Sequence, residues 1–239
     1  MCVNDVEQFS RGHGMGTGVT AGGNKAGADS NPRSGRVPLD GLVERLLAMS
    51  PFQYRVAADD SEREIAYRLR GSVVVANGWR SAVELDDGME RDSYDERAVH
   101  ILGWDGSMPV ATGRIVLPPN LPTEAACELV IEPVGHVADV GRMCVAPTHQ
   151  GREHAAFVGL MCRLYQEVRI QGYEVACGMM SAPARTLVRL FGLHLEVLGP
   201  EQVHWNEPRT PVRFSLTTNA DAASHLAEPL SESGSGKDQ

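Results

Sequence analysis

The segment between Val137 and Gly172 constrains the fold of this chain more than any other. Val137–Val145 is mostly apolar and predicts a strand, and Glu153–Gln171 predicts a long helix that ends at the C-cap Gly172. Apolar residues fall on one face of that helix, at positions 156, 157, 160, 161, 164 and 168. A strand followed closely by a helix with one apolar face predicts an α/β domain, in which the helix covers a sheet.

The two ends of the chain differ from this segment in composition. Residues 1–38 hold eight of the 25 glycines and have no apolar periodicity. Such a segment buries too little apolar surface to offset its ordering entropy, so we expect a disordered Gly-rich arm. Residues 223–239, which end in SESGSGKDQ, predict a disordered tail for the same reason. One folded domain is therefore expected at 39–222.

The periodicity within 39–222 predicts a mixed sheet. A hairpin is expected at Asp105-Gly106, because this pair favours the positive φ angles of a tight turn. Ser61 and Glu64 resemble a capping box at the start of a second helix, and Pro118–Pro133 is expected to be irregular. Further helices are expected at Leu39–Met49 and from Ser181, and strands at Phe52–Ala57, Ala98–Trp104, Met108–Leu117, Tyr173–Met179, Leu195–Leu198 and Val212–Leu216.

Composition excludes several classes of protein. The formal net charge of −9 repels phosphate backbones and anionic lipid, and no apolar run reaches the roughly 18 residues of a membrane span. The five cysteines are widely spaced, without a CxxC pair, and the histidines share no ligand spacing. We therefore expect a cytoplasmic protein with reduced thiols and no metal, nucleic-acid partner or membrane span.

The loop between the Val137–Val145 strand and the long helix predicts an anion site. Gln150, Gly151 and Arg152 lie just before the helix, where backbone N–H groups and the positive end of the helix dipole face outward. A phosphate is the natural ligand of such a helix start.

With this loop the sequence resembles the GNAT superfamily of N-acetyltransferases, whose loop pattern is Gln/Arg-x-x-Gly-x-Gly/Ala. Thr148-His-Gln-Gly151-Arg-Glu153 keeps the first glycine but lacks the initial Gln or Arg. It also places a carboxylate, Glu153, where a small residue lets the backbone approach a pyrophosphate. The resemblance therefore implies an acyl-phosphopantetheine substrate more readily than acetyl-CoA.

A narrower branch of that superfamily is similar over about Tyr54–Leu198. This branch contains the acyl-homoserine-lactone autoinducer synthases and the long-chain N-acyl amino acid synthases. The matching elements occur in the order of the branch: Leu69-Arg70, Gly78-Trp79, Asp92-Ser-Tyr94-Asp95, Gly113-Arg114 and Asp139-Val-Gly-Arg142. Val74 replaces an aromatic residue of the autoinducer synthases and Asp139 replaces a glutamate, which favours the amino acid acylating relatives.

The resemblance implies a fold and a division of the site. The expected fold is a mixed, mostly antiparallel twisted sheet with splayed central strands and helices on both faces. A bulge is expected within Val140–Cys144, eased by Gly141. The expected donor-binding residues are Arg142, Met143, Cys144, Val145, Gln150, Gly151 and Arg152. Those expected in an acceptor-side or structural network are Arg70, Trp79, Asp92, Asp95 and Arg114.

The reaction implied is transfer of a fatty acyl group from acyl carrier protein or acyl-CoA to a primary amine, first of all the α-amine of an amino acid. A general base must neutralise the amine, and Asp139 is the first candidate, followed by Glu132 and His136. No tightly bound cofactor is expected.

Three other readings stay open. An autoinducer synthase would use S-adenosylmethionine as acceptor, and a short-chain enzyme would use acetyl-CoA. A non-catalytic relative would bind an acyl carrier in the same groove without releasing its thiol.

Overall fold

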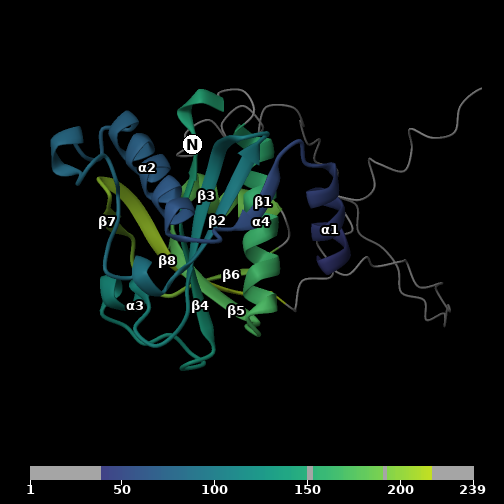
Figure 1. Cartoon of the computed structure of the whole chain (residues 1–239). Helices are drawn as coiled ribbons and strands as arrows, with labels where there is room; N and C mark the ends of the chain where they lie inside the picture. Colours follow the sequence, from purple (N-terminus) through teal and green to yellow (C-terminus); the bar gives the residue numbers. More distant parts are fainter. Residues whose placement is uncertain (1–38, 150–152, 191–192, 217–239) are drawn as a thin grey trace, which may run out of the picture.

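The computed structural model describes residues 39–149, 153–190 and 193–216 (Figure 1). Its helices are α1 (Leu39–Met49), α2 (Asp60–Ala76), α3 (Pro122–Cys127), α4 (Glu153–Ile170) and α5 (Ala182–Leu190). Its strands are β1 (Gln53–Val56), β2 (Val99–Asp105), β3 (Met108–Val116), β4 (Val137–Val145), β5 (Val175–Met180), β6 (Leu195–Val197), β7 (Gln202–His204) and β8 (Glu207–Ser215). Short 3₁₀ turns lie at Ala82–Glu84, Asp95–Arg97 and Pro147–His149.

The described strands form one sheet, in the order β1–β2–β3–β4–β5–β8–β6, with β7 paired to β8. Neighbouring strands are antiparallel except β4 and β5, which run parallel. The mixed, mostly antiparallel sheet predicted from the sequence is therefore confirmed.

Helices α2 and α4 cover opposite faces of the sheet (Figure 1). Side chains alternate between the two faces along β3. Arg114 points to the α2 face, where it bonds Asp95, itself a partner of Arg70 in α2. A side chain at the preceding residue, Gly113, would instead meet Leu164 of α4 at 2.8 Å. The predicted apolar stripe of α4 packs on that second face, and α1 lies outside it against α4.

Three local features differ from the sequence prediction. Helix α2 begins after Asp59, whose carboxylate accepts the backbone N–H of Glu62 at 3.0 Å, instead of at a capping box on Ser61. The segment expected to be irregular contains α3, which Pro122 can start because the first helical residue needs no N–H partner. The last strand begins at Glu207, since it first pairs with β7 in a hairpin that the sequence did not reveal.

The two parallel strands in the middle of the sheet separate along their length. The register of β4 and β5 runs only from Val137–Val175 to Asp139–Cys177, although both strands continue. Beyond that point β4 stays paired with β3, and β5 stays paired with β8. The splayed central strands that the resemblance implied are thereby confirmed, and the gap between them opens at Val140.

Gly178 of β5 lies where the two strands begin to separate, close to the backbone of Val140. A Cβ atom at this position would lie 2.5 Å from the carbonyl oxygen of Val140. We expect Gly178→Ala to lower the free energy of unfolding by about 1–3 kcal/mol, because backbone must shift to admit the methyl group. Urea denaturation measures this value. Gly199→Ala is the control, since its Cβ would meet Pro211 at an ordinary 3.6 Å; equal losses in both variants would contradict the expectation.

Candidate functional site

A large cavity lined by described residues passes through the gap between β4 and β5. Its volume is about 490 Å³, within the range of small-molecule sites. We call the part on the α2 side the polar end and the part on the α4 side the apolar end. The polar end is lined by Arg70, Trp79, Glu90, Asp92, Arg114, Arg142, His204, Trp205 and Arg209, and the apolar end by Leu39, Val43, Phe157, Met161, Leu164, Val168, Val188 and Phe214.

A bulge in β4 places Arg142 at the polar end. Thr112 is in register with Cys144 and Arg114 with Gly141, so two residues of β4 oppose one residue of β3. In a regular strand Arg142 would face α4, because paired residues share a face and Gly141 shares that of Arg114. Arg142 instead has a φ of 52° and reaches the α2 side. The predicted bulge is confirmed, but Arg142, and not Gly141, adopts the left-handed backbone.

Asp95 is the centre of a buried ion cluster at the polar end. Its carboxylate accepts hydrogen bonds from Arg70 at 2.7 and 2.9 Å, from Arg114 at 2.8 Å and from the backbone N–H of Asp92 at 2.7 Å. Burial alone would raise the pKa of Asp95, but the hydrogen bonds and charges of the two arginines outweigh it and hold the pKa well below its usual range. Asp95 is therefore a paired anion that does not take up a proton near neutral pH.

Arg142 completes the cluster from β4. It donates to Glu90 at 3.2 Å and to Asp92 at 2.8 Å, and these two carboxylates also pair with Arg70 and Arg114. Three guanidinium groups thus face three carboxylates. Burial lowers the pKa of Arg142, against the opposing charge of Glu90. Asp92 is the carboxylate of the cluster with the greatest access to the cavity, with 28% of its side chain exposed.

Asp139 lies where β4 leaves β5, and it lines the cavity. Its buried carboxylate accepts the backbone N–H of Thr123, in the first turn of α3, at 2.7 Å. Burial raises the pKa of Asp139, while the hydrogen bonds from Thr123 oppose the rise. This is the direction that a general base at neutral pH requires. Glu132 and His136 are instead exposed on the loop before β4 and do not line the cavity.

Only some of the residues predicted to bind the donor line the cavity. Met143 and Cys144 line it, whereas Val145 is buried beside it and outside its lining. Gln150, Gly151 and Arg152 lie outside the described residues, so the loop that would hold a phosphate stays a prediction.

The buried thiols are poor nucleophiles. Cys144 lines the cavity and Cys177 is paired in register with Asp139. Burial raises the pKa of both thiols, so they stay protonated near neutral pH. The site therefore favours direct attack by a substrate over a covalent acyl-cysteine.

The β7–β8 hairpin contributes residues that the sequence analysis missed. Trp205 and Asn206 form its two-residue turn with φ angles of 59° and 54°, which is typical of a type I′ turn. Asn206 donates to the carbonyl oxygen of Trp79 at 3.3 Å, and the rings of Trp79 and Trp205 lie 6.3 Å apart. The hairpin therefore docks on the loop after α2, and His204 and Arg209 on either side of the turn reach the polar end.

The described part of the chain offers neither a metal site nor a membrane span. No group of three or more His, Cys, Asp and Glu side chains there could hold a metal ion. No helix in these ranges has the length and apolar character to cross a membrane.

Comparisons with known proteins agree with the fold of this chain. Residues 69–159 match the family model described as an acetyltransferase (GNAT) domain. The solved structure of the AHL synthase LasI is similar with a TM-score of 0.60 and 17% identity, over 73% of this chain and 94% of that chain. The CoA-dependent acyl-homoserine lactone synthase MesI has a TM-score of 0.58 and 20% identity, over 78% and 97%. No curated protein matches the sequence.

A third solved structure is that of an N-acyl amino acid synthase, the second kind of enzyme in the branch that the sequence resembles. FeeM, an N-acyl amino acid synthase from uncultured soil microbes, has a TM-score of 0.51 and 15% identity, over 73% of this chain and 97% of that chain. The match over residues 69–159 and the fold shared with these structures indicate a GNAT-like fold, the fold of this class of acyltransferase. The resemblance found in the sequence motifs is confirmed.

The buried ion cluster predicts a large effect of Asp95→Asn. The substitution leaves the guanidinium groups of Arg70 and Arg114 short of a buried counter-charge, so the free energy of unfolding at pH 7 should fall by about 3–5 kcal/mol. Asp87→Asn is the control, because the carboxylate of Asp87 is 71% exposed and its ion pair with Arg68 should be worth about 1 kcal/mol or less.

A comparison of wild type with Asp95→Asn also tests the lowered pKa of Asp95. A depressed folded-state pKa contributes stability above the unfolded-state pKa, about 4 for an aspartate, and loses it as the pH falls through the folded value. The stability difference between wild type and Asp95→Asn should therefore shrink on acidification below about pH 4. Urea denaturation across this range measures it; a difference that grows with acid would contradict the assignment.

Proposed function

We propose that this acyltransferase moves a fatty acyl group from a phosphopantetheine thioester to a primary amine, with the α-amine of an amino acid as acceptor. The thioester is carried by acyl carrier protein or by coenzyme A. One observation carries the proposal: a single cavity joins an apolar end, the gap between splayed strands and a charged end.

The apolar end suits a long acyl chain. Phe157, Met161 and Leu164 line it from α4, and Leu39 and Val43 line it from α1. An acetyl group would leave most of this apolar wall uncovered, whereas a fatty chain would bury itself against it. The geometry therefore favours long-chain donors over acetyl-CoA.

The reaction requires a neutral amine beside the thioester carbonyl. The amine nitrogen attacks the carbonyl carbon, the new C–N bond forms, the C–S bond breaks, and the sulfur leaves as a thiol after protonation. Asp139 faces the cavity with a raised pKa and accepts the proton that the attacking amine loses, directly or through water. Binding both substrates in one cavity supplies the required proximity.

The bulge in β4 supports stabilisation of the oxyanion. The extra residue at Arg142 interrupts the ladder between β3 and β4 beside the gap. A bulge leaves backbone groups out of the ladder, and a free N–H at this point would donate to the oxygen that becomes negative during attack.

The choice between the two carriers rests on charge. Two of the arginines that could attract an acidic carrier protein, Arg163 and Arg169 on α4, are paired with Glu167 at 2.7 Å and Glu174 at 3.3 Å. This pairing weakens any basic face on α4. Both donors are therefore included in the test.

The purified protein can be assayed with acetyl-CoA, dodecanoyl-CoA and dodecanoyl acyl carrier protein. The acceptors are a mixture of the protein amino acids and, separately, S-adenosylmethionine. Thiol release gives the rate, and mass spectrometry identifies the product. We expect N-dodecanoyl amino acids from one or both long-chain donors and little turnover of acetyl-CoA.

Other results would select another function. A lactone formed from S-adenosylmethionine alone would identify an autoinducer synthase. Turnover of acetyl-CoA alone would identify a short-chain enzyme. A protein that releases no thiol from any donor is a non-catalytic relative.

Asp139→Asn separates catalysis from structure. The rate should fall by about 10²–10⁴-fold, and the low-pH limb of the rate profile that follows the raised pKa of Asp139 should disappear. The free energy of unfolding at pH 7 should not fall, because the amide oxygen can still accept the N–H of Thr123 and a buried charge is removed. Glu132→Gln is the matched control, since Glu132 is exposed away from the cavity. Normal turnover by Asp139→Asn would exclude it as the base.

A further inference from the structure

Arg209 of β8 is a charged residue at the polar end that takes no part in the ion cluster around Asp95. It lines the cavity and donates a hydrogen bond to Glu207 at 3.2 Å. Its guanidinium group lies over the ring of Trp79, with the guanidinium carbon 5.5 Å from the ring centre. Its Nε atom is buried and has no hydrogen-bond partner among the described residues. A buried donor without a partner is costly in free energy, so a ligand or water is expected to complete it.

The turn beside Arg209 is held in a strained form. Trp205 is a bulky residue with positive φ, a conformation that persists only where surrounding contacts impose it. Its ring lies 4.7 Å from the guanidinium carbon of Arg142 and 5.0 Å from that of Arg80. The turn is also held by Trp79, whose ring packs near that of Trp205 and whose carbonyl oxygen accepts a hydrogen bond from Asn206. The hairpin thus presents two indole rings and several guanidinium groups at one end of the cavity.

Most positive charges at this end are paired with carboxylates. Arg142 belongs to a cluster of three guanidinium groups and three carboxylates, and Arg209 has Glu207 as its ion-pair partner. Arg80 lies against the Trp205 ring but is exposed, outside the cavity lining, and has Glu84 nearby. Burial, together with the nearby charges of Arg142 and Arg209, lowers the pKa of His204 to about 4, so its ring is neutral at pH 7. The unpartnered Nε–H of Arg209 therefore stays as a donor for a negative group at this end.

We infer that the acceptor amine carries a carboxylate and that Arg209 binds this carboxylate through its unpartnered Nε–H. The inference rests on the proposed function and names the contact by which that site selects its acceptor. Guanidinium is well suited to carboxylate, and charge-assisted bonds of this kind are among the strongest polar contacts. The carboxylates of Asp92 and Asp139 line the same cavity and are available to the amino group.

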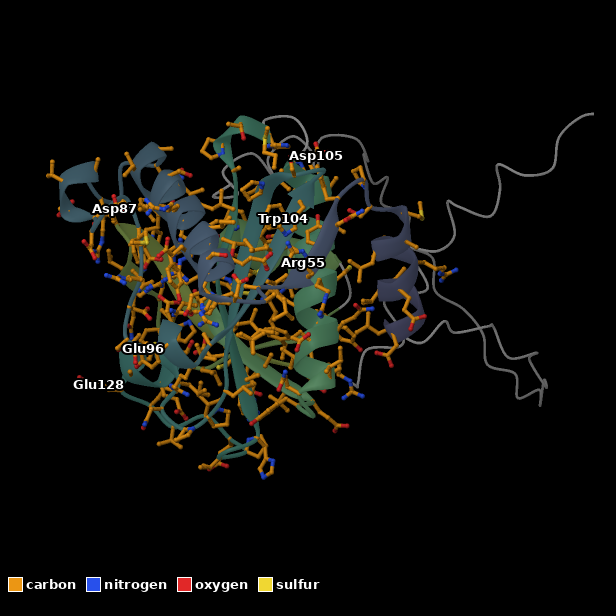
Figure 2. All side chains as sticks on the ribbon, viewed as in Figure 1. Arg55, Asp87, Glu96, Trp104, Asp105 and Glu128 are labelled. Carbon is orange, nitrogen blue, oxygen red and sulfur yellow. The ribbon has the colours of Figure 1, made fainter. Side chains whose placement is uncertain are left out.

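The tryptophans provide a binding signal that does not depend on activity. Trp79 and Trp205 lie at the site, whereas Trp104, the third tryptophan, lies on β2 beside Arg55 and Asp105, outside the cavity lining (Figure 2). The full chain is titrated with L-leucine, L-phenylalanine and S-adenosylmethionine, each alongside its decarboxylated counterpart. At least one carboxylate-bearing compound should change the fluorescence, and its counterpart should bind at least about tenfold more weakly.

Variants assign the contact to Arg209. Arg209→Gln should weaken binding of the carboxylate compound by at least about tenfold, and Arg209→Lys, which keeps the charge but loses Nε, should weaken it less. Arg213→Gln is the matched control, because Arg213 lies on the same strand, pairs with Glu196 and does not line the cavity. Thermal melting checks folding, and Arg209→Lys carries the test if Arg209→Gln does not fold.

Three results would overturn the inference: no carboxylate compound of the panel binds, the decarboxylated counterparts bind equally well, or the Arg209 variants bind like wild type. None of these results depends on thiol release. A protein that binds L-leucine through Arg209 but releases no thiol would refute the proposed function and keep only the carboxylate contact of Arg209. Equal rates of acylation of L-leucine and 3-methylbutylamine would refute the inference and keep the function.

Discussion

One extra residue in β4 determines where the charges of this protein meet. The bulge carries Arg142 from the α4 face of the sheet to the α2 face, where Glu90 and Asp92 are already buried or partly buried. Without that guanidinium the two carboxylates would face each other with less positive charge, and an uncompensated buried charge is strongly destabilising. The bulge also lies beside the gap between β4 and β5. The same backbone irregularity therefore serves the charged cluster and the passage between the two ends of the cavity.

Two carboxylates near this passage differ because their surroundings differ. Asp95 is buried but paired with two arginines, which keeps its pKa low, whereas Asp139 is buried with the backbone N–H of Thr123 as its partner and its pKa rises. Environment therefore separates a structural anion from a group able to exchange a proton. A buried ion cluster is weak evidence for stability by itself, since apolar residues often pack as well. Its value here is to hold α2, β3 and β4 in a fixed relation around the polar end.

Much of the fold could be predicted from periodicity. The strand–helix pair β4–α4 and the β2–β3 hairpin carry strong local signals, and ordered motifs indicated Arg70 and Asp139. Glu90 could not be found, because it lies in a polar loop and its partners are distant in sequence. The β7–β8 hairpin was missed because its turn is Trp205-Asn206, without the glycine that marks most type I′ turns. Contacts between distant segments, such as Asn206 with Trp79, leave no trace in local pattern.

Helix α1 closes the apolar end from outside the sheet. It packs on α4, where the hydroxyl of Tyr165 donates to Asp40 at 2.6 Å, and it contributes Leu39 and Val43 to the cavity wall. If an acyl chain fills this end, its terminal methyl is stopped by an element that takes no part in the sheet, the bulge or the ion cluster. Substitutions in α1 could then lengthen or shorten the lipid made while the reacting groups stay untouched, so product size and catalytic rate would be separable properties of this molecule.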